Sequence, residues 1–457
     1  MNWFRCGSVA YMWTSLQVDL NQSRAQEPTY LLLPNRLSRP SAPSIGPCTS
    51  LVPIKSLPGC SRGSSDEEIY FASGHLNGWI VLWSLIRNRA SHQWLAHPNS
   101  QVTALQYWPR EQTDLLLSQG RDGFIRFWSL ALLDHLGFDD PLPQALSEIH
   151  TCTFTFCPMC FWSSAANSSA DLQPGPDYYL AHVRSSEGAT EADNIVEVIK
   201  FPDNVIVADT SMLKSEETFA GFSKLGMCMA LQGVPVPRSS QEDRLPQCIV
   251  VVGYESGDVV VYGDGVVIAR LEHVLGQGIP VLTLSLQPHS PGVTDEFGGI
   301  LAIGGPSIMG TPAKTDLTFA SLICSVKLGA CSLSCLTRIP VSENCGISSF
   351  AWRSDGKILA VGQWNGEIRL FEAVWQKTKA KLRPFGCLTS LGGLNEGGLL
   401  GEWASTTVSK PHGPTVDQQS TSIRACLFTP VSNWLITAAP ANAGAVGSIL
   451  VWDVYRK

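Results

Sequence analysis

Residues Ser73 to Leu85 have the sequence Ser-Gly-His-Leu-Asn-Gly-Trp-Ile-Val-Leu-Trp-Ser-Leu, and residues Ser118 to Leu130 have the sequence Ser-Gln-Gly-Arg-Asp-Gly-Phe-Ile-Arg-Phe-Trp-Ser-Leu. Each phrase places a polar turn between two short apolar strands and closes on a tryptophan. The closing residues, Trp83 and Trp128, are 45 residues apart. A period of about 40 to 45 residues, with four short strands and a tryptophan near the end of each unit, is typical of the WD40 β-propeller. The phrases therefore predict an all-β ring of repeated blades.

Weaker copies of the phrase occur at Val252–Tyr262, Val361–Phe371 and Gly447–Val454. The gap from Trp128 to Tyr262 holds about three periods, or two and an insertion, and the gap from Tyr262 to Phe371 holds two and an insertion. This spacing predicts seven blades. A chain of 457 residues would otherwise suggest about three domains, but no repeat of this kind buries its apolar face alone, so one ring is the simpler interpretation.

The ring must close, because a propeller whose terminal strands do not meet in one blade keeps open sheet edges. We expect a strand near Tyr30–Leu33 to pair with Ser448–Val454. Residues 1–27 fit no blade phrase and lack the continuous apolar core of a secretory signal, so they are predicted to be an irregular tail before one propeller spanning 28–457. Its inserted loops are expected at about 163–177, 235–246, 304–316 and 386–419.

The composition suits a folded β-protein with many turns. Hydrophobic residues make up 44% of the chain and charged residues 16%, with 40 Gly and 29 Pro. A formal net charge of -7 leaves no excess of Lys and Arg to neutralise phosphates, so direct nucleic-acid binding is not expected. No run of 18 or more apolar residues is present, so no membrane-spanning segment is expected.

Four polar or amphipathic residues of the second phrase form the main candidate constellation. His97, Ser118, Asp122 and Trp128 stand where WD repeats commonly build a buried hydrogen-bond chain from a histidine between blades to a turn aspartate, a strand serine and an indole N–H. Such a chain satisfies groups that would each cost about 1 to 3 kcal/mol if buried alone. The alternative, a catalytic Ser/His/Asp set, needs an exposed serine on a sharp turn, and no Gly-x-Ser-x-Gly occurs. We expect no catalytic residue, no cofactor and no enzyme activity.

The fourteen cysteines have irregular spacings, and Cys248, Cys324 and Cys426 lie in predicted strands, where we expect small core residues of an intracellular protein. The nearest approach to a metal motif is Cys157-Pro-Met-Cys160. The other candidate ligands are Cys152 and His150 just upstream and Cys331 and Cys335 far downstream. A structural zinc site normally combines two such pairs at closer range, so no metal is expected. The Gly298-Gly299 and Gly304-Gly305 pairs are predicted to be turns, because no Gly-Lys-Ser/Thr follows them.

Several stretches resemble one family of WD-repeat proteins, the ASTRA-associated protein 1 family, also called guanine nucleotide-binding protein beta subunit-like protein 1. The resemblance is carried by Leu116–Asp122, Lys224–Met229, Val252–Gly257, Arg353–Ala360 leading into Trp364, and the opening Pro28–Leu33, and it covers about residues 28–457. Three departures accompany it. The first Gly-His of the family is replaced by Pro34-Asn35-Arg36, its Gly-Trp-Asp by Gln363–Gly366, and its closing Ala-Gly-Ser-Lys-Asp by Ala438–Gly444.

The resemblance implies a non-catalytic scaffold in a chromatin-linked multiprotein assembly. Such a protein would help large phosphatidylinositol-3-kinase-related kinases to mature, together with kinase co-chaperones and AAA+ ATPases, in the nucleus and also in the cytoplasm. The alternative is a G-protein β-like signalling adaptor. That class normally carries an N-terminal coiled-coil helix, and residues 1–27 show no heptad pattern. The residues alone predict only a rigid ring with faces and loops for protein partners.

Overall fold

The structure is a computed structural model. It describes residues 30–32, 45–54, 69–85, 87, 89–110, 113–133, 143–151, 156–164, 176–185, 194–210, 225–237, 246–287, 296–306, 314–325, 330–343, 345–376, 379–389, 422–430, 434–438 and 449–454. The predicted tail at 1–27 lies outside these residues.

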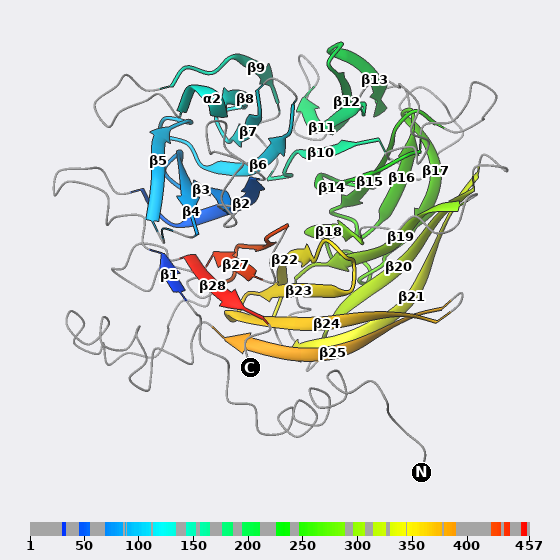
Figure 1. The fold of residues 1–457 in the computed structure, drawn as a ribbon. Helices are drawn as coiled ribbons and strands as arrows, with labels where there is room; N and C mark the ends of the chain where they lie inside the picture. The colour runs from blue at the N-terminus through cyan, green and yellow to red at the C-terminus, as the bar shows by residue number, and fades with distance from the viewer. Residues whose placement is uncertain are drawn as a thin grey trace, which may run out of the picture.

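Seven four-stranded antiparallel sheets stand around a central axis like the blades of a propeller, as predicted (Figure 1). In each of the first six blades the strands follow one another in sequence from the centre outward. Blade one contains β2 (Cys48–Ile54), β3 (Tyr70–His75), β4 (Trp79–Ser84) and β5 (Arg89–Leu95), and blade two contains β6 (Val102–Trp108), β7 (Leu115–Gly120), β8 (Phe124–Ser129) and β9 (Ser147–His150). Blade three contains β10 (Cys160–Ser163), β11 (Tyr178–Ser185), β12 (Asn194–Phe201) and β13 (Val205–Asp209), and blade four contains β14 (Cys228–Val234), β15 (Ile249–Tyr254), β16 (Val259–Gly263) and β17 (Val266–Leu271). Blade five contains β18 (Thr283–Leu286), β19 (Glu296–Gly304), β20 (Lys314–Ser325) and β21 (Ala330–Glu343), and blade six contains β22 (Ile347–Trp352), β23 (Ile358–Gln363), β24 (Glu367–Gln376) and β25 (Lys379–Thr389).

The seventh blade joins the two ends of the chain. It contains β26 (Ala425–Phe428), β27 (Trp434–Ala438) and β28 (Ile449–Asp453), and its fourth strand is β1 (Tyr30–Leu32). Tyr30 lies opposite Val451 and Leu32 opposite Ile449 in an antiparallel pair. The predicted closure of the ring by the N- and C-terminal strands is therefore confirmed.

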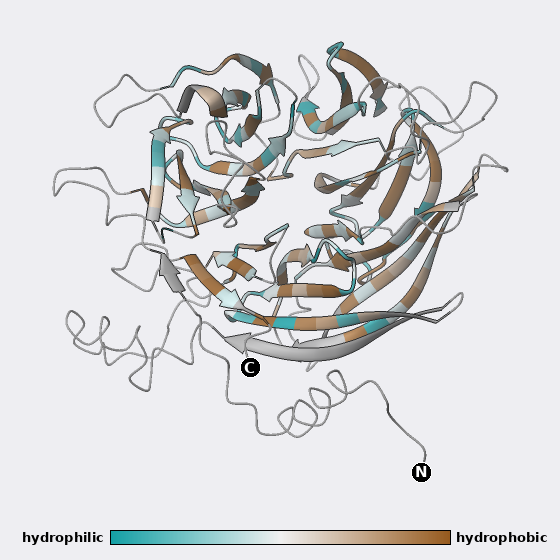
Figure 2. Ribbon diagram, viewed as in Figure 1, coloured by the Kyte–Doolittle hydropathy of each residue, from teal (hydrophilic) through white to brown (hydrophobic). Residues whose placement is uncertain are grey.

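The middle strands of each blade are apolar on both faces, because neighbouring blades cover both sides. All six residues of β15 and all five of β16 are buried. The hydrophobic colouring of these strands runs through the ring in Figure 2. Trp83 and Trp452, which close blade phrases, are among the largest fully buried side chains, so these closing aromatic residues are core residues.

The outer boundaries of two strands differ from the sequence interpretation. β20 begins at Lys314 and β25 continues to Thr389, so strand replaces the edges of the loops expected at 304–316 and 386–419. Most of the four predicted loops lies outside the described residues. The prediction that Gly298, Gly299 and Gly304 form turns is wrong, because all three lie within β19. In Gly298 φ is +126°, and in Gly304 an added Cβ would approach the Ile347 side chain, so glycine suits both strand positions.

Helix is nearly absent from the described part of the chain. α2 (Leu130–Leu133) is a single turn that follows β8. Among the described residues, no helix is long and apolar enough to cross a membrane.

Candidate functional site

The structure brings the four residues of the candidate constellation in blade two together. His97 Nδ1 lies 3.0 Å from Asp122 Oδ1, and His97 Nε2 lies 2.8 Å from the Ser118 hydroxyl. The Trp128 indole N–H donates to the same hydroxyl at 2.8 Å. His97 Nδ1 also lies 2.6 Å from Arg126 Nη1, so the imidazole links the Asp122 carboxylate and the Arg126 guanidinium at Nδ1 to the Ser118 hydroxyl at Nε2. Ser118 and His97 are fully buried, and the hydroxyl is used to link two side chains inside the blade.

Asp122 is the charged end of this chain. Burial disfavours its ionised form, but the hydrogen bonds and charges of His97 and Arg126 outweigh burial and hold the pKa of Asp122 below its usual value. Arg126 Nη1 lies 2.5 Å from Asp122 Oδ2, and Arg126 Nε lies 2.7 Å from Glu148 Oε1. These contacts connect β7, β8 and β9 of blade two to His97, which lies in the segment before β6.

Blade one contains an equivalent chain that the sequence analysis missed. The Trp83 indole N–H donates to the Ser73 hydroxyl at 2.7 Å, and His75 Nε2 lies 2.8 Å from that hydroxyl. His75 Nδ1 lies 3.0 Å from the Gly46 carbonyl oxygen, which fixes the neutral tautomer. Burial lowers the pKa of His75 to about 4. In blade one the imidazole belongs to β3 itself. The amino-acid sequence lacks the expected Gly-His before this blade.

The strand register shows why His75 can do this. Cys48 lies opposite His75, Val102 opposite Gly120 and Cys228 opposite Tyr254, and each pair is followed by the same register shift. His75, Gly120 and Tyr254 therefore occupy equivalent positions in their blades. In blade two that position is Gly120, and a Cβ there would collide with the His97 ring and the Asp122 carboxylate. Blade two thus places a histidine from outside the strand over a glycine, whereas blade one carries the histidine on the strand itself.

Blade four fills the same space with a tyrosine pair. Tyr262 takes the place of the closing tryptophan, and its hydroxyl lies 2.7 Å from the hydroxyl of Tyr254. Burial raises the pKa of Tyr262 and the pKa of Tyr254 well above the usual value, so both hydroxyls stay protonated. In blade seven the Trp452 indole N–H donates to Thr437 Oγ1 at 3.0 Å. These polar groups are buried, and each is hydrogen-bonded within its own blade.

The turns between the second and third strands lie together at one end of the ring. In four blades the same hydrogen bond fixes this turn, from a turn N–H to the carbonyl that precedes the innermost strand; the pairs are Leu76 with Pro47, Arg121 with Gln101, Glu255 with Met227 and Trp364 with Gly346. Their side chains are unlike one another. Leu76 and Trp364 are 39% and 38% exposed, and the Arg121 guanidinium lies 3.8 Å from the ring centroid of Phe156, which is 60% exposed.

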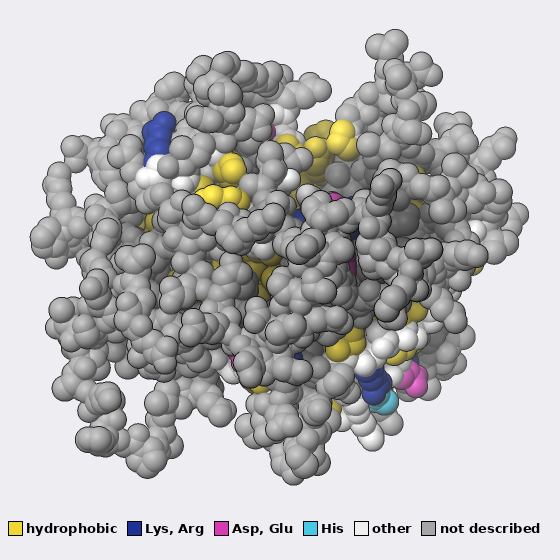
Figure 3. All heavy atoms as spheres, turned by 60° about the horizontal axis from the view of Figure 1, so that its bottom comes forward, with side chains coloured by type: hydrophobic (Ala, Val, Ile, Leu, Met, Phe, Trp, Pro, Cys, Tyr) yellow, Lys and Arg dark blue, Asp and Glu magenta, His cyan; other side chains and the backbone are white. Residues whose placement is uncertain are grey.

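The turn end therefore presents both apolar and charged side chains to solvent. In the view of Figure 3, the visible hydrophobic side chains of described residues lie in separate groups, with single basic and acidic side chains near some of them.

Of the cysteines considered as metal ligands, Cys152 lies outside the described residues, and the others form no metal-binding cluster among the described residues. Cys157 and Cys160 are buried in the core shared by blades three and four, where Cys160 Sγ accepts the Gly233 N–H at 3.1 Å. Burial raises the pKa of Cys160 to about 11, whereas a zinc ligand is a thiolate. Within the described ranges, no three His, Cys, Asp or Glu residues are placed to hold a metal ion.

Cys324 differs from the expectation of a free core cysteine. It is buried in blade five as predicted, but it forms a disulfide with Cys331 on the neighbouring strand. The reason is register: Cys324 and Cys331 lie directly opposite each other on β20 and β21, with Cα atoms 4.1 Å apart.

Comparison with known proteins gives relatives of the same fold. Residues 334–387 match the family model for the anaphase-promoting complex subunit 4 WD40 domain. The fold resembles Raptor from Chaetomium thermophilum, with a TM-score of 0.53 at 10% identity over 97% of this chain and 30% of that chain. It also resembles the RRP9 WD40 repeats, with a TM-score of 0.50 at 14% identity over 93% of this chain and 98% of that one. At these identities the structures show the fold alone.

Two sequence relatives cover most of the chain. ASTRA-associated protein 1 of Verticillium alfalfae is 23% identical over 411 residues, which span 86% of this chain and 88% of that protein. ASTRA-associated protein 1 of Aspergillus niger is 21% identical over 360 residues, which span 69% of this chain and 73% of that protein. These matches confirm the resemblance inferred from the blade phrases: the chain is a seven-bladed WD40-repeat propeller that is similar, over most of its length, to ASTRA-associated protein 1.

Proposed function

We propose that the protein is a non-catalytic WD-repeat scaffold in an ASTRA-type multiprotein assembly. The observation that carries this proposal is the similarity to ASTRA-associated protein 1 over 86% of the chain. The buried hydrogen-bond chains of blades one and two support a structural role for their Ser and His residues, because each hydroxyl is bonded inside its blade.

The finer features of this proposal come from the family resemblance. We propose a role in chromatin remodelling and in the maturation of phosphatidylinositol-3-kinase-related kinases, with kinase co-chaperones and AAA+ ATPases as partners in the nucleus and also in the cytoplasm. Contact with nucleic acid would be indirect, since the net charge of -7 disfavours binding to phosphates.

Affinity purification of the full chain, followed by mass spectrometry, tests the proposal. Recovery of kinase co-chaperones and AAA+ ATPases in constant ratio to the bait is the expected result. Recovery of G-protein γ subunits would favour the alternative signalling adaptor, and turnover of a substrate by the purified chain would overturn the non-catalytic role. Imaging of the tagged chain checks the location, and exclusion from the nucleus would contradict it.

A further inference from the structure

The outermost strand of blade five is an unusually long sheet edge. β21 has 14 residues, whereas the outermost strands of blades one to four and seven have three to seven. Within the described parts of the chain it pairs with β20 alone, and it runs along the outside of the ring (Figure 1). An outermost strand offers unpaired backbone N–H and C=O groups to another chain, and proteins normally protect long edges with charges, prolines or bulges.

The first half of β21 carries none of these protections. The register is unbroken from Ala330 to Cys335, a run with the sequence Ala-Cys-Ser-Leu-Ser-Cys, and the first shift comes at Leu336. The side chains of Ser332, Ser334 and Cys335 are exposed. This run of six residues carries no charge, and its half-buried members, Cys331 and Leu333, pack against the core shared with blade four.

The outer strand of blade six, β25, is also long, with 11 residues, and it provides a contrast. The register of β25 is likewise unbroken from Lys379 to Pro384, and that run includes Lys379, Lys381, Arg383 and Pro384. Three basic residues and a proline are the usual means of blocking an edge. Neighbouring strands of equivalent topology thus differ in the feature that decides whether another strand can be added.

The register also shows which groups of β21 point outward. The Cα atoms of Cys324 and Cys331 are 4.1 Å apart, a separation typical of a non-hydrogen-bonded antiparallel pair. Cys331, and by alternation Leu333 and Cys335, then direct their N–H and C=O groups away from β20. The intervening Ser332 and Ser334 direct theirs toward β20.

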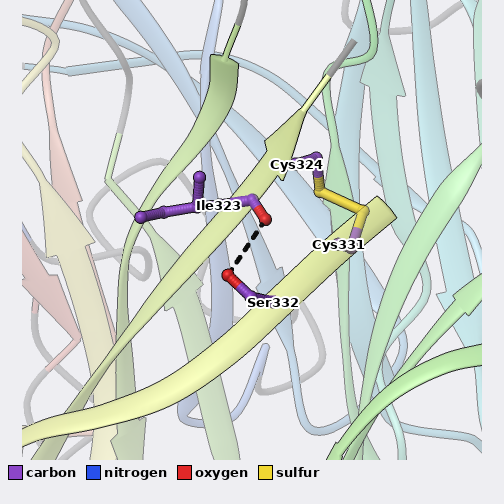
Figure 4. The surroundings of a disulfide bond; sticks show 4 residues. All are labelled: Ile323, Cys324, Cys331 and Ser332. Atoms are coloured by element: carbon purple, nitrogen blue, oxygen red, sulfur yellow. Dashed lines mark hydrogen bonds between the residues drawn. A yellow bond between two sulfur atoms is a disulfide. The ribbon is translucent and has the colours of Figure 1, made fainter. Parts of the chain in front are cut away.

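This part of the hairpin is held in place before any partner arrives. The disulfide joins β20 to β21, and Ser332 Oγ donates to the Ile323 carbonyl oxygen at 3.4 Å beside it (Figure 4). Leu333 packs against the core shared by blades four and five. An edge that is already ordered loses little conformational entropy when a strand binds.

We propose that β21 binds an extended segment of a partner protein as a fifth strand of blade five, paired with the outward backbone groups of Cys331, Leu333 and Cys335. Arg338 lies on the same strand beyond the shift, is exposed, and takes part in no ion pair among the described residues. The segment would therefore combine small or β-branched side chains with an acidic residue that meets Arg338. This assignment rests on the proposed scaffold function and names one mode by which the scaffold holds a partner.

The test uses the full chain and a fluorescent peptide in which threonine and valine alternate around a single glutamate. Anisotropy should show saturable binding, and hydrogen exchange should slow at the amides of Cys331, Leu333 and Cys335, with Ser332 and Ser334 unchanged. Cys335→Pro removes one outward N–H from an exposed residue and should weaken binding about tenfold, whereas Cys335→Ser keeps that N–H and should bind like the wild type. Arg338→Ala should weaken binding of the glutamate peptide but not of its glutamine counterpart.

The proposal is overturned if the peptide does not bind at millimolar concentration, if Cys335→Pro binds as well as Cys335→Ser while both variants melt like the wild type, or if β21 instead joins two copies of this chain in gel filtration. Each result stands apart from the affinity purification above, since peptide binding does not require any ASTRA-type partner to be present.

Discussion

His75 Nε2 lies 2.8 Å from the Ser73 hydroxyl, so blade one obtains from its own second strand the imidazole that blade two receives from His97. The two histidines come from different points of the blade phrase. They nevertheless occupy equivalent space, because the register places His75 where blade two has Gly120. The loss of Gly-His at the start of the ring is thus compensated within the blade.

We expect His75→Ala to lower the free energy of unfolding by about 1 to 3 kcal/mol, because the buried Ser73 hydroxyl can then donate only through the long contact to the Val81 carbonyl oxygen at 3.4 Å. Urea denaturation measures this change. The neighbouring Leu76 is 39% exposed, and Leu76→Ala should change the free energy by less than about 0.5 kcal/mol. Equal effects of the two substitutions would show that the hydrogen-bond chain of blade one contributes nothing to stability.

His75 should also make stability depend on pH. Burial lowers its pKa from 6.5 to about 4, so between these values the unfolded chain binds a proton that the folded chain does not. This contribution is complete above pH 6.5, is lost as the pH falls toward 4, and amounts to about 3 kcal/mol. Unfolding measured from pH 7 to pH 4 should therefore show a steeper loss for the wild type than for His75→Gln, and parallel curves would contradict the assignment.

Moving the strand histidine of blade one to the equivalent position of blade two tests whether His75 and Gly120 occupy equivalent positions. Gly120→His alone should be strongly destabilising, because the His97 ring already occupies that space. His97→Ala alone leaves Ser118 and Asp122 without their partner. The double variant should be more stable than the sum of the two single effects by at least about 1 kcal/mol in a double-mutant cycle. Additive effects would mean that the two positions do not share one site.

The tyrosine pair of blade four should show the cost of an orphaned hydroxyl. Tyr254→Phe leaves the buried Tyr262 hydroxyl without the partner that lies at 2.7 Å, so we expect a loss of about 1 to 3 kcal/mol in thermal or urea unfolding. The double variant Tyr254→Phe, Tyr262→Phe should cost little more than the single one, since no polar group is then left alone. A doubled loss would argue that each hydroxyl has a separate role.

Deleting Ile449 to Lys457 should prevent folding of the ring. The deletion removes β28, which lies between β1 and β27, and it exposes apolar side chains worth about 1.5 to 3 kcal/mol each when buried. We expect an insoluble product, whereas deletion of residues 1–27 should leave a soluble protein that melts cooperatively. Circular dichroism of the soluble fraction distinguishes these outcomes. A cooperative melt of the protein that lacks Ile449 to Lys457 would mean that the ring closes elsewhere.

The sequence by itself determined the ring, its blade count and its closure. Period, turn residues and closing aromatics are local properties of each repeat, and a repeat that cannot bury its own face must stack on its neighbours. The same local pattern predicted the set His97, Ser118, Asp122 and Trp128, because WD repeats hold these residue types at regular spacing.

Only the tertiary structure decided what depends on register between strands. The imidazole of His75, the Tyr254 and Tyr262 pair and the disulfide of Cys324 with Cys331 each require knowing which residue lies opposite which. A bulge shifts that correspondence by one residue and turns a side chain to the other face, and the sequence does not show where bulges fall. The open edge of β21 likewise became visible only when its partner strand and its unbroken register were known.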